Sequence, residues 1–371
     1  MSSSQLSTAL LANRRIRVLI VDDSMFIRNI VGRIFREDPA IEVVGQAVDG
    51  LDAIGKVTEL KPDVVTLDVE MPRMTGLEAI KKIRTAWPPV KIIMLSTLTE
   101  MGARVTIDAL LNGANDYVSK TNSDGSNELP IPRLKHDLIA KVRQFFPTRA
   151  RVPTPTAPFT KAATFVPARP TGSLHSKKRR RVVAIGVSTG GPSALSELVP
   201  ALPANLGVPV VIVQHMPAMF TRILAERLNS TSPLKVVEAS ENAPVEAGTV
   251  LIAPGDFHMR VTRRGGRECI TLDQSSPENS CRPAVDVLFR SVNEIYGGNS
   301  VAVVLTGMGQ DGLQSTKLLK ASGAYVIAQD EASSVVWGMP GVVARAGLAD
   351  AVLDLKLVAS AICSQIQGWS S

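Results

Sequence analysis

Short runs of apolar residues alternate along the chain with longer segments in which apolar residues recur at helical spacing. Such runs are typical of buried strands, and the spaced segments are typical of helices packed on them. The alternation fills residues 16–147 and begins again at residue 182. Strands that alternate with helices favour a parallel sheet covered by helices on both faces. We therefore predict an α/β fold throughout, with a doubly wound, mainly parallel sheet in the second half.

The pattern also predicts where the elements lie. In the first half, strands are predicted at 16–21, 41–46, 64–68, 91–96 and 116–118, and helices at 24–37, 50–59, 75–85, 100–111 and 132–145. In the second half, strands are predicted at 182–187, 208–214, 249–253, 300–306 and 325–329, with a hairpin within 257–271 that turns at Gly265 and Gly266. Ligands of such sheets bind at the carboxyl ends of the strands.

Polar residues follow the strands of the first half at that carboxyl edge. Asp22 and Asp23 end the first strand, and Asp68 ends the third. Ser96 ends the fourth strand, and Lys120 lies just beyond the fifth. Three carboxylates at one edge repel one another unless a hard cation joins them, and oxygen ligands suit Mg²⁺. The alternative is that the first two acids only cap the helix that follows them.

The motifs VDDS, LDVEMP, MLST and DYVSK make this half similar to the receiver domain of two-component signalling, a flavodoxin-like fold with a five-stranded parallel sheet. The resemblance implies that Asp68 accepts a phosphoryl group from a histidine kinase. It implies that Ser96 and Lys120 contact the phosphoryl oxygens and that Tyr117 changes rotamer on activation. Thr121 stands where the family often has proline, so the loop 121–129 is expected to have its own geometry. The implied Mg²⁺ ligands are Asp23, Asp68 and the backbone carbonyl of Glu70, with Asp22 assisting.

The first strand of the second half leads into a glycine-rich turn, VVAIGVSTGGPS. Gly186 to Gly190 satisfy the pattern G-x-S-x-G, in which small flanking residues let a strand-to-helix turn expose a serine hydroxyl. Ser188 is that serine. Because serine is a poor nucleophile at its free pKa, the turn predicts hydrolysis only if an imidazole and a carboxylate reach it.

Four histidines could supply the imidazole. His136 lies in the last predicted helix of the first half, and His175 lies between the halves. His215 directly follows the apolar run VVIVQ, which should place it at the same sheet edge as Ser188. A lone histidine after a strand is more often structural, but the serine turn at that edge favours a base. His258, after APGDF, is the weaker candidate for the base and is expected to line the pocket.

The predicted carboxylate is Asp311, in LTGMGQDG after the apolar run VAVVL. Its glycines let the backbone approach a substrate closely. An acid in this role orients the imidazole and stabilises its protonated form. Asp256 and Asp330 also follow strands and remain alternatives.

Six motifs make the second half similar to the catalytic domain of chemotaxis protein-glutamate methylesterases: IGVSTGGP, VQHMP, APGDFHM, SCRPAVDVLF, LTGMGQDG and EASSVVWGMP. The resemblance implies a phosphorylation-activated hydrolase that demethylates glutamates on methyl-accepting chemoreceptors and deamidates specific glutamines through an acyl-enzyme. Ser188 would be the nucleophile, His215 the general base and acid, and Asp311 its orienter. Backbone amides, including those of Thr189 and Met308, are candidates to bind the oxyanion. No cofactor is expected for this chemistry.

The net charge of +7 is concentrated in one segment. Residues 148–181 hold nine Lys and Arg and no Asp or Glu, whereas the flanking segments are nearly balanced. This stretch, rich in proline and small residues, is interpreted as an extended linker whose basic run is solvated or contacts an acidic surface or membrane headgroups. The predicted plan is a leader (1–15), a receiver domain (16–147), this linker and a catalytic domain (182–371). We expect the unphosphorylated receiver to lie across the catalytic edge and block it.

Other features exclude further classes. No apolar run approaches membrane-spanning length, and 6–12 is too short for a signal peptide. The three cysteines lack disulfide or metal spacing, which suits a reducing compartment, and they receive no role. We expect a cytoplasmic monomer with a histidine kinase and chemoreceptors as partners and no nucleic acid, because no helix-turn-helix pattern follows the linker.

Two rival hypotheses remain. A dinucleotide-binding fold would use the same glycine-rich turn to hold phosphates, but it requires an acid at the end of the next strand, where Gln214 and His215 stand. A phosphorylation-controlled binding protein without chemistry is the second rival. Loss of hydrolysis in Ser188→Ala would separate both from the esterase hypothesis.

Overall fold

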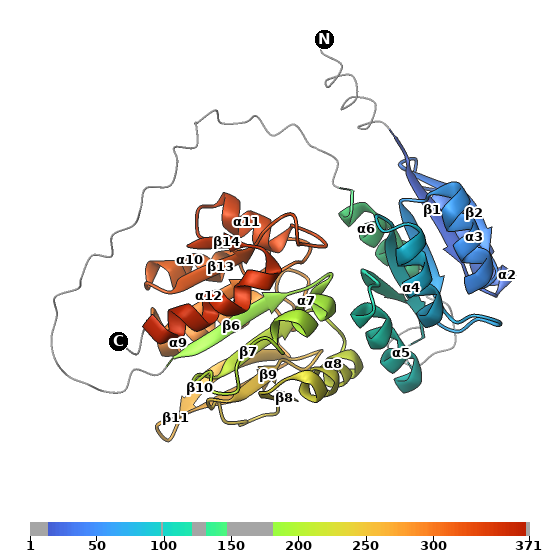
Figure 1. Ribbon diagram of the computed structural model, residues 1–371. Helices are drawn as coiled ribbons and strands as arrows, with labels where there is room; N and C mark the ends of the chain where they lie inside the picture. The colour runs from blue at the N-terminus through green and yellow to red at the C-terminus, as the bar shows by residue number, and fades with distance from the viewer. Residues whose placement is uncertain (1–13, 98, 121–130, 147–180, 369–371) are drawn as a thin grey trace, which may run out of the picture.

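The computed structural model describes residues 14–97, 99–120, 131–146 and 181–368. These residues form two α/β units, drawn in blue to teal and in green to red in Figure 1. Most of the predicted leader, the loop 121–129, His175 and nearly all of the predicted linker lie outside the described residues.

The first unit is built on a five-stranded parallel sheet. Its strands are β1 (Ile16–Val21), β2 (Ile41–Ala47), β3 (Val64–Asp68), β4 (Lys91–Ser96) and β5 (Asp116–Ser119). Its helices are α2 (Met25–Arg36), α3 (Gly50–Leu60), α4 (Gly76–Ala86), α5 (Glu100–Leu111) and α6 (Ile131–Gln144). The strand order is β2-β1-β3-β4-β5. Every predicted element is present, with both ends within one residue of the prediction.

Local sequence explains these ends. The central strand β3 is buried along its whole length, which its unbroken apolar character requires. Helix α4 begins at a capping box, in which Thr75 and Glu78 each bond the other's backbone N–H. Buried apolar residues of α3, α4 and α5 cover one face of the sheet, and those of α2 and α6 cover the other.

The second unit is built on a seven-stranded sheet in the order β14-β13-β12-β6-β7-β9-β8, in which all pairs are parallel. Its strands are β6 (Val182–Val187), β7 (Val210–Gln214), β8 (Lys235–Glu238), β9 (Thr249–Ile252), β12 (Ser300–Val304), β13 (Tyr325–Gln329) and β14 (Ala351–Leu353). Its helices are α7 (Gly191–Leu198), α8 (Ala218–Thr231), α9 (Val285–Tyr296), α10 (Leu313–Ala321), α11 (Met339–Arg345) and α12 (Leu355–Gly368). A separate antiparallel hairpin joins β10 (His258–Arg264) to β11 (Arg267–Asp273).

The hairpin turn at Gly265 and Gly266 is as predicted, but the sequence missed both edge strands of the large sheet. β8 and β14 are four and three residues long, and each has exposed or half-buried positions, so neither contains an unbroken apolar run. The predicted strand 208–214 also starts two residues too early, because β7 begins at Val210.

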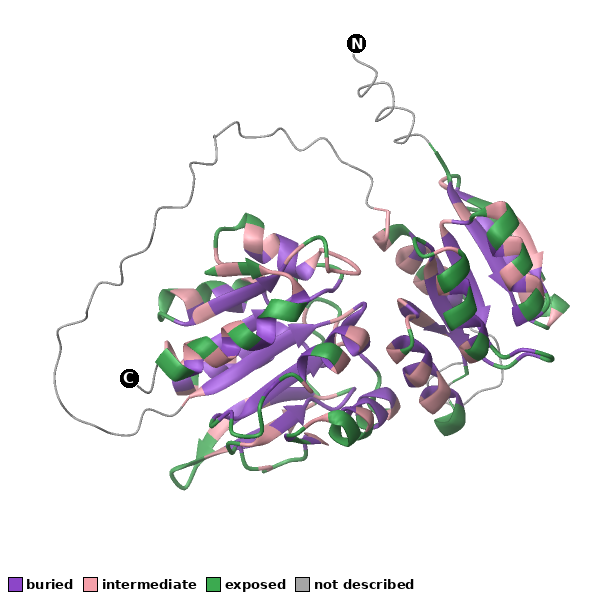
Figure 2. Ribbon diagram, viewed as in Figure 1, coloured by how far each residue is buried: buried purple, intermediate pink, exposed green. Residues whose placement is uncertain are grey.

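The two units share a packed interface. Helix α5 of the first unit packs against α7 and α8 of the second. Buried apolar residues from both sides form one cluster, which includes Ile107, Leu195 and Phe220. Figure 2 shows the burial concentrated in both sheets and on the helix faces toward them. None of the helices in the described part of the chain is long and apolar enough to cross a bilayer.

Candidate active site

Ser188 and His215 follow neighbouring strands of the second unit. β6 pairs with β7 so that Val187 lies opposite Gln214, which brings the next residue of each strand to the same edge. The His215 N–H donates to the Val187 carbonyl at 3.2 Å. Both residues line a cavity of about 60 Å³. Within the described residues, the Ser188 hydroxyl makes no hydrogen bond, so the predicted serine–histidine contact is not formed here.

Two glycines make the serine turn possible. A Cβ on Gly186 would lie 2.4 Å from a methyl carbon of Val285, so a side chain there would displace α9. Gly190 has φ +78°, in the left-handed region that favours glycine, and it begins the turn into α7. The G-x-S-x-G spacing is therefore explained by the close contact of Gly186 with α9 and by the left-handed backbone conformation of Gly190.

Asp311 lies well beyond the end of β12, yet its carboxylate reaches the histidine. Its Oδ2 lies 2.8 Å from His215 Nε2. The same carboxylate accepts the N–H groups of Val285 at 2.6 Å and Asp286 at 3.0 Å, which are the first residues of α9. A helix N-terminus stabilises negative charge. Burial raises the pKa of Asp311, but the hydrogen bonds from His215 and from these two amides outweigh it and hold the pKa below its usual range.

The His215 ring has two different neighbours. Because Asp311 is ionised, Nε2 carries the proton between them, and Nδ1 is left to exchange a proton with Ser188. Cys281 Sγ lies 3.5 Å from Nδ1. Burial lowers the pKa of His215, but the hydrogen bonds and charges of Asp311 and Cys281 outweigh it and raise the pKa to about 10.

The structure separates the candidates that the sequence left open. Asp256 is exposed, and the Asp330 carboxylate accepts the N–H and O–H of Ser333. His258 is fully buried and does not line the small cavity, contrary to the prediction. Its Nδ1 accepts the Ala284 N–H, and its Nε2 donates to the Ser276 carbonyl, so it anchors the segment before α9.

The two oxyanion candidates differ in exposure. Thr189 is buried, whereas half of Met308 is exposed. Within the described residues, neither backbone N–H donates a hydrogen bond, so both are available to an oxyanion as far as this part of the chain shows. Their role stays a prediction.

The receiver-like unit closes the small cavity. Leu110, Asn115, Asp116, Tyr117 and Lys141 of the first unit complete its lining. The Thr189 hydroxyl donates to Asp116 Oδ2 at 2.9 Å, next to the serine. The Tyr117 ring stacks on Phe220 with the ring centres 4.6 Å apart. The sequence contained no signal for Asp116, because its partner lies in the other unit.

Asn279 is a second residue that sequence reasoning missed. Its carboxamide donates to Asp311 Oδ1 at 2.8 Å and to Asp286 Oδ2 at 3.0 Å. It lies next to the motif SCRPAVDVLF, which also contains Cys281. The motif marked the segment, but nothing in the spacing indicated which side chains face the histidine.

The predicted acids of the first unit do meet. Oxygen atoms of Asp22, Asp23 and Asp68 lie within 4.8 Å of one another, and Lys120 Nζ lies 2.8 Å from Asp22 Oδ2 and 2.7 Å from Asp68 Oδ1. Burial, opposed by Lys120 and reinforced by Asp22, raises the pKa of Asp68 to about 6. This all-oxygen donor set fits Mg²⁺, whose charge would relieve the repulsion. The contribution of the Glu70 carbonyl stays a prediction.

Ser96 borders the acid cluster and is buried. Its hydroxyl accepts from Thr106 Oγ1 at 2.6 Å and donates to the Thr97 carbonyl at 3.1 Å. Thr106 belongs to α5, the helix that packs on the second unit. The Ser96 carbonyl accepts the Lys120 N–H at 2.7 Å, so Ser96 contacts both the backbone of Lys120 and the interface helix.

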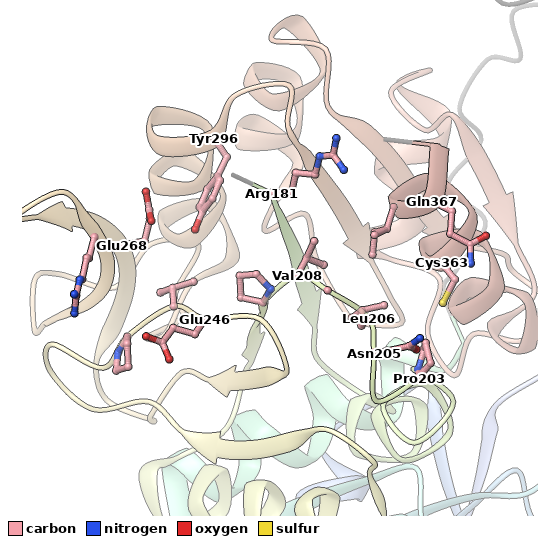
Figure 3. A pocket seen from close by; sticks show the side chains of 16 residues that line it. Arg181, Pro203, Asn205, Leu206, Val208, Glu246, Glu268, Tyr296, Cys363 and Gln367 are labelled. Atoms are coloured by element: carbon pink, nitrogen blue, oxygen red, sulfur yellow. The ribbon is translucent and has the colours of Figure 1, made fainter. Parts of the chain in front are cut away.

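A larger cavity, about 850 Å³, lies at the other end of the large sheet (Figure 3). Arg181 and Val208, which line it, precede β6 and β7, whereas Ser188 and His215 follow these strands. None of the candidate catalytic residues lines it. The chemistry therefore points to the small, covered cavity and not to the large, open one.

Comparison with known proteins agrees with both units. Residues 183–362 match the family model described as CheB methylesterase, and residues 18–127 match that of the response regulator receiver domain. A protein-glutamate methylesterase/protein-glutamine glutaminase of a Nocardioides species is 49% identical and covers 92% of both chains. Its namesake from Trichodesmium erythraeum is 46% identical over 95% of this chain and 99% of its own.

A solved structure is similar to the second unit. The crystal structure of the Thermotoga maritima CheB methylesterase catalytic domain is 44% identical, covers 50% of this chain and 98% of that one, and has a TM-score of 0.49. Each of the two relatives aligns with more than nine-tenths of this chain, in which the receiver match precedes the methylesterase match. On this evidence the chain belongs to the protein-glutamate methylesterase/protein-glutamine glutaminase family, with a response regulator receiver domain preceding its CheB methylesterase domain.

Proposed function

We propose that the chain is a phosphorylation-controlled hydrolase that demethylates glutamate methyl esters on chemoreceptors and deamidates specific glutamines. One observation carries the chemistry: an ionised Asp311, held at the N-terminus of α9, bonds His215 at the sheet edge where Ser188 lies. The names of the relatives supply the substrate class. The chemoreceptor helices that it acts on would place the enzyme in the cytoplasm.

The proposed reaction passes through an acyl-enzyme. The Ser188 oxygen attacks the ester carbonyl carbon while His215 Nδ1 takes the hydroxyl proton. The tetrahedral intermediate then expels methanol, which carries that proton away, and a glutamine would release ammonia in the same step. Water attacks the acyl-enzyme, His215 takes a proton from it, and the proton returns to Ser188 as the glutamate leaves.

The docked arrangement is not ready for this step. Residues of the first unit help to line the cavity that contains Ser188 and His215, so a receptor side chain cannot enter it while the two units are docked. The Ser188 hydroxyl also lacks its bond to the ring. Both features agree with an enzyme that must open before it reacts.

The receiver domain supplies the proposed control. Asp68 would accept the phosphoryl group from a histidine kinase, and Asp22, Asp23 and Asp68 would hold Mg²⁺, with the Glu70 carbonyl as a further ligand. Bound Mg²⁺ would neutralise charge on the acids and the phosphoryl oxygens. Lys120 is already paired with two of the acids, so it is in place to contact the phosphoryl group.

A physical route from Asp68 to the esterase runs through α5. Phosphorylation adds about two negative charges and new acceptor oxygens, which would draw the Ser96 hydroxyl away from Thr106. Loss of that bond would free α5, whose Glu100, Arg104 and Asp108 pair with arginines and a glutamate of α8. These pairs are exposed and contribute little each, so modest changes in α5 could release the interface.

A methanol-release assay on methylated receptor, with and without a small-molecule phosphodonor, tests both parts. We expect Ser188→Ala to abolish release while Asp68 still becomes phosphorylated. Removal of residues 1–147 should raise basal release, because the cavity would no longer be covered. Persistent release by Ser188→Ala would disprove the proposed nucleophile, and an unchanged or lower rate after the deletion would argue for positive activation by the receiver.

A further inference from the structure

A tight turn just before α9 contacts both His215 and Asp311. Glu278 and Cys281 exchange backbone hydrogen bonds of 3.1 and 2.8 Å, and the two residues between them, Asn279 and Ser280, have φ of +51° and +62°. These are the features of a two-residue hairpin turn. Arg290 of α9 donates to the Glu278 carboxylate at 2.9 Å. The turn is therefore fixed to the helix whose N-terminus holds Asp311.

Asn279 lies between two buried carboxylates. Its amide nitrogen donates one hydrogen bond to Asp311 and one to Asp286. Asp286 also accepts the Ser315 N–H at 2.7 Å. Two neighbouring buried carboxylates raise each other's pKa unless donors separate them. Asn279 thus favours the ionised form of Asp311, which the catalytic pair requires.

Cys281 lies on the opposite side of the pair. Its sulfur is 3.5 Å from His215 Nδ1, the nitrogen that Asp311 leaves free. Ser188 needs this nitrogen for its proton, so the thiol occupies the position that the serine hydroxyl must take. The sulfur is a weak acceptor for the Nδ1–H of the protonated ring, and a hydroxyl can replace it at the ring.

We propose that two side chains of this turn position the catalytic groups of the hydrolase: Asn279 holds the Asp311 carboxylate, and Cys281 holds His215 Nδ1 until the Ser188 hydroxyl replaces it. The proposal rests on the proposed function. Neither side chain needs to touch the substrate, so both act through the histidine–aspartate pair.

Several charged groups face His215 and have to be kept constant in a test. Asp311 and Cys281 contact the ring, and the Asn279 side-chain amide bonds both Asp311 and Asp286. Across the small cavity lie Asp116 and Lys141 of the receiver domain. Measurements on the full chain with saturating phosphodonor hold the receiver in one state.

The first test is the pH profile of kcat/KM for methanol release by Cys281→Ala. Because Cys281 stabilises the protonated ring, its removal should move the acid limb to lower pH by roughly 0.5 to 1 unit, with a ~3- to 10-fold gain below the limb. Cys363→Ala, at the far cavity, is the matched control and should match the unmodified chain. An acid limb that stays in place in Cys281→Ala would overturn the role of the thiol, because lost packing alone lowers the plateau without moving the limb.

The second test compares two substitutions at Asn279. Asn279→Ala should lower kcat ~10-fold with KM nearly unchanged. Asn279→Asp should lower it ~100-fold, because a third carboxylate would raise the pKa of Asp311 and oppose its ionised form. Ser280→Gly changes the same turn but keeps its shape, and it should behave like the unmodified chain. Equal losses in the two Asn279 variants, or the same loss in Ser280→Gly, would mean that the turn acts only through its shape.

Nitrogen NMR of the His215 ring separates this proposal from the proposed function. The pKa of His215 should fall in Cys281→Ala whether or not the protein hydrolyses receptor esters. If the pKa of His215 falls in Cys281→Ala but the unmodified chain releases no methanol, the positioning role of Cys281 stands and the proposed substrate is wrong. An unchanged pKa together with normal release would keep the function and refute the role of Cys281.

Discussion

The two sheets of this chain bring polar residues to their carboxyl edges in different ways. In the receiver domain, Asp22, Asp68 and Ser96 lie at or next to the last residue of their strands. In the esterase domain, only Ser188 and His215 do so, whereas Asp311 comes from a loop beyond β12. Strand ends alone complete the first site. The second also needs loops that return to the edge.

The central carboxylates of the two sites also differ in charge state. Both are buried, yet the pKa of Asp68 is raised to about 6 and that of Asp311 is lowered. Asp68 lies beside a second acid, whereas Asp311 accepts hydrogen bonds from two amides at a helix N-terminus and from His215. The contrast teaches that burial does not fix the charge of an acid, because the partners decide it.

The largest effect is expected from Asp311→Asn, which removes the fixed charge from the esterase pair. An amide cannot hold His215 in the required tautomer, and methanol release should fall ~10³- to 10⁴-fold. Asp330→Asn is the matched control, since that carboxylate bonds Ser333 and not the histidine. A loss below tenfold in Asp311→Asn would mean that His215 does not depend on this acid. The losses of Asp311→Asn and Ser188→Ala should not add, because the residues act as a unit.

A smaller effect is expected where the two domains meet. Asp116→Ala removes the acceptor of the Thr189 hydroxyl and should raise basal methanol release ~10-fold, with a correspondingly smaller gain from phosphodonor. Asp137→Ala changes an acid of α6 that pairs within its own helix, and it should leave both rates unchanged. If Asp116→Ala gave the basal rate of the unmodified chain, this hydrogen bond would have no part in the inhibited state.

The smallest effect concerns the stability of the receiver domain. The pKa of Asp68 is about 6 in the folded chain and about 4 in an unfolded one, so the folded state holds the proton more tightly. Stability contributed by this group is therefore lost as pH rises from about 4 to about 6. Asp68→Asn should raise the free energy of unfolding by ~2 kcal/mol at pH 7 and by nearly nothing below pH 4. Amide hydrogen exchange in β1 and β3, without Mg²⁺, measures this free energy of unfolding. An equal increase at pH 7 and below pH 4 would contradict the raised pKa of Asp68.

Much of the site could be predicted because its residues follow buried strands. An apolar run fixes where a strand ends, and parallel pairing brings consecutive ends to one edge, which was enough for Asp68, Ser188 and His215. The same reasoning could not separate Asp311 from Asp256 and Asp330, since each follows a strand. Only the path of the loop shows which carboxylate returns to the histidine.

The sequence by itself determined the two α/β folds, the position of the central strands along the chain and the chemistry available at each edge, because burial and periodicity are local properties of the chain. The tertiary structure alone decided that Asn279 and Cys281 contact the His215–Asp311 pair, that His258 anchors the segment before α9, and that Asp116 accepts the Thr189 hydroxyl. These contacts join residues far apart in the chain, and their geometry depends on how helices and loops pack. The alternation of polar and apolar residues does not predict that packing.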